Sequence, residues 1–213
     1  MTPPARTDHD ARRTEVSQAV WRVLAARGFG GLTLRAVAAE MGATTGLLTH
    51  YFPSKRALLK HALEVLDRHS ADRPRPAARR AGEASGLAML RAVLLDILPL
   101  DAESAASNRI WVASWDVALT DPELAREHAE RYRRARERMA GHIADAQRLG
   151  ELPPGPRADD TAAAAQSFVL GLVVQALFAP QEFLAERQTA LVDAYLARLP
   201  GDGDGGAEAP VAD

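Results

Sequence analysis

The sequence predicts an all-α fold, with an N-terminal three-helix head built around a helix-turn-helix and a larger C-terminal helical domain. The first observation is that apolar residues recur at spacings of three and four rather than two, which is typical of helices and not of strands. The second is that prolines and glycines divide the 213 residues into segments of helical length. Hydrophobic residues make up 47% of the chain and charged residues 25%, which is enough to build an aliphatic core.

The head is expected at residues 12–70, behind a flexible N-terminal arm at residues 1–11. Its first helix ends at Gly28, a residue that suits the left-handed stop beyond a last turn. Thr33 can cap a second helix, and Gly42 ends that helix after about two turns. The apolar face of the first helix is formed by Val16, Val20, Val23 and Leu24.

A third helix begins after the cap residue Thr44. It must end by Phe52, because the residue before Pro53 is pushed out of the helical region. Ser54 can cap a fourth helix. The inner stripe of this fourth helix is expected to comprise Leu59, Ala62, Leu63 and Leu66.

The C-terminal domain is expected at residues 83–199, after a linker at residues 71–82 that is rich in Arg, Pro and Ala and has no apolar period. The tail at residues 200–213 is glycine-rich and acidic, so we expect it to be disordered. Prolines separate five helices in this domain, expected at residues 83–98, 103–119, 122–149, 159–178 and 181–199.

Several functional classes are excluded by composition and motif spacing. The chain has no cysteine, which rules out disulfides, thiolate catalysis and cysteine-built metal sites. The six histidines form no pair with metal-binding spacing, and His128 and His142 would lie roughly 21 Å apart along one helix. The glycine-rich stretch at residues 28–31 follows a helix rather than a strand, so it does not indicate an enzyme. We therefore expect neither an enzyme nor a bound cofactor or metal.

The expected location is the cytoplasm. The first fifteen residues have no apolar stretch of the kind that opens a signal peptide. The longest apolar run, Phe168 to Pro180, is shorter than a membrane span. The charge is uneven, because residues 1–60 carry a formal +5 and the remainder −7. The basic end of the chain is the one that would meet a polyanion such as DNA.

The stretch LRAVAAEMGATTGLLTHYFP, residues 34–53, has the pattern of a helix-turn-helix. Ala38 is small where the two helices cross, Gly42 stands at the turn, and Leu48 and Tyr51 return the second helix to the core. The outward face of that helix then carries short residues that can approach base edges closely. These residues are Thr44, Thr45, Gly46, Leu47, Thr49 and His50.

The next turn carries two cations. Lys55 and Arg56 occupy the first turn of a helix, where the macrodipole disfavours positive charge by roughly 0.3 to 1 kcal/mol each. A bound phosphate would reverse that effect, and Lys55 together with the backbone N–H groups could hold it. The alternative is a tight helical corner of a ligand-binding or enzymatic domain, in which both cations are merely solvated.

The segment TLRAVAAEMGATTGLLTHYFPSKRALL, residues 33–59, resembles the DNA-binding signature of the tetracycline-repressor (TetR) family, whose members are all-helical homodimers. Thr49 stands where most members have tyrosine. With the following His-Tyr-Phe it is similar to the choline-responsive betaine-synthesis regulator (BetI) branch of that family. The segment RIWVASWDVALTDPELA, residues 109–125, also resembles the C-terminal domain of that branch.

The resemblance implies a transcriptional regulator, most often a repressor, that binds palindromic operator DNA as a homodimer and is released by a small-molecule effector. The alternative is a helical ligand-binding or protein-interaction module without sequence-specific DNA binding. We expect phosphate contacts from Thr33, Thr44, Tyr51 and Lys55. We expect base contacts from Arg35, Thr45, Leu47, Thr49 and His50, with Gly46 permitting close approach.

The C-terminal domain is expected to bind the effector. Trp111 and Trp115 share one helix face, and core packing is the simpler interpretation, while a cavity wall is the alternative. A flat hydrophobic ligand would suit such a wall, as would a choline-like cation balanced by nearby carboxylates such as Asp96, Glu103 and Asp116. The expected lining is Leu90, Leu94, Trp111, Trp115, Phe168 and Leu172.

Dimerisation is expected through the last two helices. The helix at residues 159–178 is apolar on nearly every side, so one of its faces needs a partner. The helix at residues 181–199 would complete a four-helix arrangement with the symmetry mate. The alternative is that helices of the same chain cover both faces.

Overall fold

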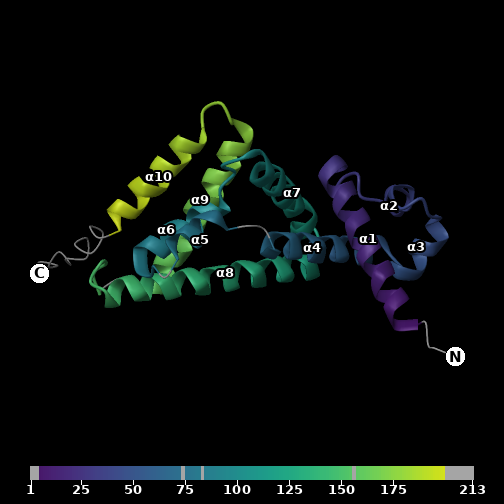
Figure 1. Ribbon diagram of the computed structural model, residues 1–213, viewed down its shortest axis with the longest axis horizontal. Coiled ribbons are helices and arrows are strands. Elements are labelled where there is room, and N and C mark those ends of the chain that lie inside the picture. Colours follow the sequence, from purple (N-terminus) through teal and green to yellow (C-terminus); the bar gives the residue numbers. More distant parts are fainter. Residues whose placement is uncertain (1–4, 73–74, 83, 155–156, 200–213) are drawn as a thin grey trace, which may run out of the picture. The chain divides into compact units, whose positions relative to one another are not determined.

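The computed structural model describes residues 5–72, 75–82, 84–154 and 157–199 (Figure 1). Within these ranges the chain forms ten helices and no strand, which confirms the predicted all-α fold. The expected disordered tail at 200–213 lies outside the described residues. So do residues 1–4 of the expected arm and residues 73–74 of the expected linker.

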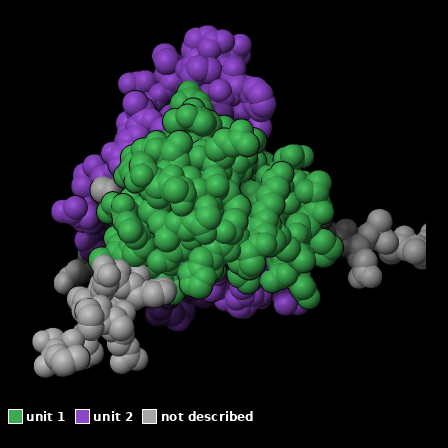
Figure 2. All heavy atoms as spheres, turned by 90° about the vertical axis from the view of Figure 1, so that its right-hand side faces the viewer, with its two compact units in different colours: residues 1–73, 109–126 green, residues 74–108, 127–213 purple. Residues whose placement is uncertain are grey.

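The chain divides into two compact units, which Figure 2 shows in separate colours. Unit 1 comprises residues 1–73 and 109–126, and unit 2 comprises residues 74–108 and 127–213. Unit 1 therefore contains the helix-turn-helix and, in addition, a corner made by two helices that lie much later in the sequence. The expected functional division into a head at 12–70 and a C-terminal domain at 83–199 stays a prediction.

The head contains four helices: α1 (Ala5–Arg27), α2 (Leu34–Glu40), α3 (Thr45–Tyr51) and α4 (Lys55–Asp72). α1 packs against both α2 and α4, and α2 packs against α3. Helix α1 begins at Ala5, so part of the segment expected as an arm has a helical backbone. Gly28 ends α1 with φ +61°, and its N–H donates to the Leu24 carbonyl at 2.9 Å, as expected of a left-handed helix stop.

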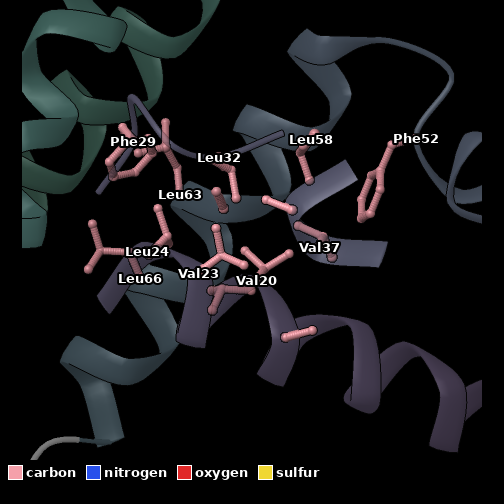
Figure 3. Close-up of a cluster of buried hydrophobic side chains, with 14 of the residues drawn as sticks. Val20, Val23, Leu24, Phe29, Leu32, Val37, Phe52, Leu58, Leu63 and Leu66 are labelled. Carbon is pink, nitrogen blue, oxygen red and sulfur yellow. The ribbon is translucent and has the colours of Figure 1, made fainter. Parts of the chain in front are cut away.

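One buried cluster joins the helices of unit 1 (Figure 3). The stripe of α4 begins at Leu58, which is 1% exposed, whereas the expected Leu59 lies half-buried at its edge. The reason is that Leu58 shares one continuous helix face with Ala62 and Leu66. Three buried residues from the later helices α7 (Ala102–Leu119) and α8 (Pro122–Arg148) also belong to the cluster, namely Ile110, Ala118 and Leu124.

Unit 2 contains α5 (Pro76–Ala81), α6 (Gly86–Ile97), α9 (Ala158–Phe178), α10 (Ala185–Arg198) and most of α8. α6 packs against α5, α9 and α10, and α9 also packs against α10. The Gln166 amide of α9 donates to the Tyr132 carbonyl of α8 at 3.2 Å and accepts from Arg136 at 3.1 Å. The five helices expected after the linker are all present, with ends shifted by a few residues.

Helix α5 was not expected, because residues 71–82 show no apolar period. The two carboxylate oxygens of Asp96 on α6 accept hydrogen bonds from Ala77 N and Ala78 N, both at 3.0 Å. These are backbone donors in the first turn of α5, which has no intrahelical partner for them. The cap comes from a residue far along the chain, so local sequence gives no sign of it. Asp96, one of the carboxylates expected near a cationic effector, therefore caps α5 in the structure.

Helix α9 is long and apolar enough to cross a membrane by length and composition alone, and 39% of that apolar window is buried in the structure. The apolar run expected from the sequence extends only from Phe168 to Pro180. The alanines before Phe168 belong to the same helix and lengthen its apolar stretch. Packing of α9 against α6 and α10 gives this helix the role of a core element of unit 2.

Candidate nucleic-acid interface

The helix-turn-helix is built by local caps. Thr33 Oγ1 accepts from Ala36 N at 3.0 Å and so begins α2. Gly42 ends α2 with φ +62°, its N–H donating to Ala39 O at 3.2 Å, while Ala43 N donates to Ala38 O at 2.9 Å. This pair of bonds is the Schellman arrangement, which turns the chain sharply into α3. The expected roles of Thr33 and Gly42 in the fold are therefore confirmed.

The expected cap at Thr44 is wrong as to its hydrogen bond. Thr44 has the extended backbone of a cap residue, but its side chain makes no cap hydrogen bond. The first turn of α3 closes through the backbone instead, with Leu47 N donating to Thr44 O at 3.2 Å. The exposed Thr44 hydroxyl therefore takes no part in ending or starting the helix.

Helix α3 is anchored on one side and open on the other. Leu48 is fully buried, whereas Leu47 and Tyr51 are half-buried, and Tyr51 packs against the buried cluster of unit 1. The Thr49 hydroxyl donates to Gly46 O at 2.8 Å, which fixes its orientation along the helix. The exposed residues of the cap and helix are Thr44, Thr45, Gly46, Thr49 and His50.

Gly46 has no conformational reason to be glycine. A Cβ built at this position would meet only Thr44 Oγ1, at 3.8 Å, which is an ordinary van der Waals contact. The residue lies in a helix without a positive φ. The described part of the chain would therefore accommodate alanine, which has the higher helix propensity. The open space lies on the outward face of α3.

The remaining expected DNA contacts flank this face. Arg35 and Thr33 are exposed at the start of α2, and Lys55 is exposed at the start of α4. Ser54 Oγ accepts from Ala57 N at 3.1 Å, so Ser54 caps α4 as expected. The first turn of α4 contains no acidic residue to offset its two cations. An ion pair of 2.6 Å between Arg22 of α1 and Glu40 of α2 ties these helices together.

Arg56 differs from the alternative in which both cations are merely solvated, because it forms an ion pair. Its Nη2 donates to Asp121 Oδ1 at 2.5 Å, and Asp121 follows α7 in the corner that belongs to unit 1. The two residues are 65 positions apart, so no local signal in the sequence indicates the pair. Sequence reasoning therefore missed this contact between the corner and the start of α4.

The six residues expected to line an effector cavity fall in both units. Trp111 is half-buried and packs against the buried cluster of unit 1, as the core-packing interpretation expects. Trp115 is half-buried, and its Nε1 is buried with no hydrogen-bond acceptor among the described residues. In unit 2, Phe168 stacks on Tyr195 with ring centroids 4.4 Å apart. Three leucines of unit 2, all buried, complete the set: Leu90, Leu94 and Leu172.

A surface pocket of about 290 Å³ lies elsewhere in unit 2, and none of those six residues lines it. It lies between the end of α8, the start of α9 and the end of α10. Its lining includes Ile143, Leu152, Thr161, Tyr195 and Leu199. Among the described residues, no group of three or more His, Cys, Asp or Glu could hold a metal ion.

The fold and the exposed face of α3 define the class of protein: a helical DNA-binding regulator of the helix-turn-helix type. Residues 17–62 match the family described as bacterial regulatory proteins, tetR family. Residues 86–201 match the C-terminal domain of the BetI-type transcriptional repressors, which covers more than half of the chain. The chain belongs to the TetR family of transcriptional regulators, in its BetI-type branch. This family consists of regulators and not of enzymes, and DNA binding and a dimeric state are typical of it.

Two named relatives place the chain within the family. The HTH-type transcriptional regulator BetI of Burkholderia thailandensis is 29% identical over 194 residues, which cover 89% of this chain and 94% of that protein. The HTH-type transcriptional regulator PksA of Bacillus subtilis is 31% identical over 110 residues. That match covers 52% of this chain and 53% of PksA, so the chain spans about half the length of this relative.

Solved structures share the fold. A transcriptional regulator from Rhodococcus sp. Rha1 superposes with a TM-score of 0.76 at 22% identity, covering 93% of this chain and 99% of that one. A putative transcriptional regulator from Saccharomonospora viridis, solved in complex with choline, also has a TM-score of 0.76, at 21% identity. The match covers 88% of this chain and 96% of the S. viridis chain. At these identities the likeness establishes the fold alone.

Proposed function

We propose that this regulator binds a palindromic operator as a homodimer, inserts α3 into the major groove, and acts in the cytoplasm as a repressor that a small molecule releases. The observation that carries the proposal is the outward face of α3. Leu48 anchors the helix, and the exposed face holds only short or hydrogen-bonding side chains. A recognition helix needs such a face, because bulk there would keep the backbone away from base edges.

The proposed contacts divide into two kinds. Thr33, Thr44, Tyr51 and Lys55 hold phosphates and so fix the position of the head on the duplex. Gly46 permits close approach of α3. The side chains that read bases are Arg35, Thr45, Leu47, Thr49 and His50.

The proposed dimer uses α9 and α10. Residues 161–181 carry no charged side chain, and Phe178 and Leu184, at the end of α9 and just before α10, are 83% and 58% exposed. Exposed large apolar side chains next to an uncharged helix face are typical of a surface that a partner covers. A second copy in the twofold arrangement would bury them and bring two copies of α3 to one palindrome.

We propose that the effector binds in the predicted C-terminal domain, beside Trp115. The buried Nε1 of Trp115 supports a ligand, because an indole N–H without an acceptor is a costly group to leave unsatisfied. A flat hydrophobic molecule and a choline-like cation are the two candidate classes. The choline complex of the S. viridis regulator favours the cation, which can also interact with indole faces.

A gel-shift experiment tests this function. Duplex DNA from the region upstream of the gene is titrated with protein, with and without choline and a panel of aromatic metabolites. We expect a specific complex that one of these ligands dissociates. Lys55→Ala should weaken binding to all sequences. It should also reduce by about one unit the salt slope, which is the slope of the logarithm of the affinity against the logarithm of the salt concentration. Thr45→Ala should instead relax specificity at one base position. Equal affinity for all sequences would instead favour a helical module that reads no DNA.

A further inference from the structure

The corner between α7 and α8 is part of unit 1, which contains the helix-turn-helix. Ala118, at the end of α7, and Leu124, in the first turn of α8, are 3% and 1% exposed and belong to the same buried cluster as the head helices. Asp121 and Glu123 lie between them, at the rim of this apolar contact. The corner is thus held by burial, and its carboxylates are presented beside the cluster.

Both carboxylates pair with cations of α4. Arg56 Nη2 lies 2.5 Å from Asp121 Oδ1 and 3.5 Å from Glu123 Oε2, and Lys60 Nζ lies 3.4 Å from Glu123 Oε1. The hydrogen bond from Arg56 lowers the pKa of the Asp121 carboxyl and raises the pKa of the guanidinium, so both groups stay charged near neutral pH. We call these four residues the corner latch.

Asp121 has a second role in the same place. Its Oδ1 also accepts from Glu123 N at 2.9 Å and Leu124 N at 3.4 Å, which caps the start of α8. One carboxylate oxygen therefore ties the first turn of α8 to the first turn of α4. That turn of α4 follows α3 after a short connection, in which Phe52 is buried in the cluster.

We propose that Arg56 is a positioning residue for operator binding, because its pairing with Asp121 and Glu123 holds the first turn of α4, and with it the end of α3 and Lys55, in the DNA-binding arrangement. This inference rests on the proposed function. The competing use of Arg56 is as a phosphate contact. The geometry favours positioning, since Arg56 Nη2 already lies within 4 Å of two carboxylates of the corner.

The test is a double-mutant cycle on operator affinity. Asp121→Asn removes the charge and keeps a good cap residue for α8, and Arg56→Gln removes the other partner. Each single change should weaken operator binding about two- to fivefold, as expected for a solvent-exposed pair, and the double variant should lose no more. Arg56→Lys should recover part of the affinity. The salt slope should stay that of wild type in every variant, because no phosphate contact is lost.

The opposite pattern would overturn the proposal. If Arg56 contacts a phosphate and the carboxylates merely compete for it, Asp121→Asn should tighten operator binding. Arg56→Gln should then reduce the salt slope by about one unit. Arg133→Gln is the matched control, because it also removes one arginine charge, from a pair with Glu130 and Glu137 on α8 in unit 2. It should leave both the affinity and the slope unchanged.

A second readout needs no DNA. Amide hydrogen exchange over residues 45–60 of the free protein should be faster in Asp121→Asn than in wild type, and unchanged in Arg133→Gln. Equal exchange in Asp121→Asn and wild type would overturn the latch. Because this measurement works on the free protein, it judges the latch even if the wild-type protein proves to have no preferred DNA sequence, which would count against the proposed function instead.

Discussion

At position 46, folding is expected to favour alanine and DNA binding is expected to favour glycine. The chain around it accommodates a Cβ, so Gly46→Ala should stabilise the protein by up to about 1 kcal/mol through helix propensity. The same methyl group should weaken operator binding, because in the proposed complex it would lie between α3 and the base edges. Urea unfolding measures the first effect, and fluorescence anisotropy on labelled operator measures the second.

Gly141 provides the control for this prediction. It is exposed in α8, and a Cβ built there meets no atom of the described chain within 4 Å. Gly141→Ala should give a comparable gain in stability with no change in operator affinity. Should Gly46→Ala bind operator as tightly as wild type, α3 does not approach DNA closely and the assignment of Gly46 is wrong.

His61 gives the head a pH-dependent stability. It is 8% exposed on α4, with Nε2 lying 3.1 Å from Ser17 Oγ of α1 and its ring 5.2 Å from that of Phe52. Burial lowers its pKa, with Arg68 and Arg13 acting in the same direction and Glu64 against it. The unfolded chain therefore takes up a proton at a higher pH than the folded chain does. The free energy of unfolding should fall as the pH drops below about 6.5, toward the lowered folded-state pKa.

His61→Gln tests the source of that loss, because glutamine keeps a group able to bond to Ser17 and does not titrate. Urea denaturation at several pH values between 7 and 5 gives the free energy of unfolding as a function of pH. The slope of this free energy against pH should be smaller in the variant than in wild type. The carboxyls with lowered pKa, such as Asp121 and Asp193, lose their stabilising contribution only at more acidic pH. Identical slopes in the two proteins would assign the pH dependence to other groups.

At the scale of single elements, the first turn of α5 is capped by one side chain of α6, that of Asp96. Asp96→Ala would leave Ala77 N and Ala78 N without their acceptors, and Ala77 is buried. We expect a loss of about 1 to 3 kcal/mol in the free energy of unfolding, with faster amide exchange in α5. Asp96→Asn keeps one oxygen acceptor, so its free energy of unfolding should lie between those of wild type and Asp96→Ala. A wild-type unfolding curve for Asp96→Ala would show that α5 is held by other contacts.

Elements with local caps could be predicted from the sequence, and elements with distant caps could not. Thr33, Gly42 and Ser54 act on residues within four positions, so α2 and the start of α4 could be recognised. Helix α5 takes its cap from α6, and Arg56 takes its partner from beyond α7. These pairings exist only after the chain has folded. Leu59 was expected in the inner stripe of its helix and is half-buried. The sequence cannot show this, because the helices that pack against α4 decide which residues at the margin of its apolar face are buried.

The candidate site also has parts that local sequence predicts and parts that it does not. The outward face of α3 follows from the helical period and the position of Leu48, both of which are local. The residues that the sequence predicts as an effector lining come from helices far apart in the chain, and they fall in different units: Trp111 and Trp115 in unit 1, Phe168 and Leu172 in unit 2. Periodicity identifies which residues are apolar and not which of them leave space for a ligand.

At the scale of the whole molecule, the proposed interface predicts how the oligomeric state responds to charge. Phe178→Asp places a carboxylate on the exposed, uncharged end of α9, where a partner copy would have to bury it. Light scattering at micromolar concentration should report a dimer for wild type and a shift toward monomer for this variant.

Leu149→Asp serves as the control, since Leu149 is also a large exposed apolar side chain of unit 2 but lies just after the end of α8. It should remain dimeric. A dimer that survives Phe178→Asp unchanged would place the interface elsewhere. Loss of the dimer should also weaken operator binding, because a palindrome gains its affinity from two heads held together.

The central claim is that α3 reads a palindromic DNA sequence, and selection of bound duplexes from a randomised DNA pool tests it most directly. The claim predicts enrichment of an inverted repeat whose half-sites are centred about one duplex turn, roughly 34 Å, apart or a multiple of it. It also predicts that Thr45→Ala relaxes the selected sequence at a single symmetric position in each half-site. A pool that shows no enriched sequence after selection with the wild-type protein would contradict it.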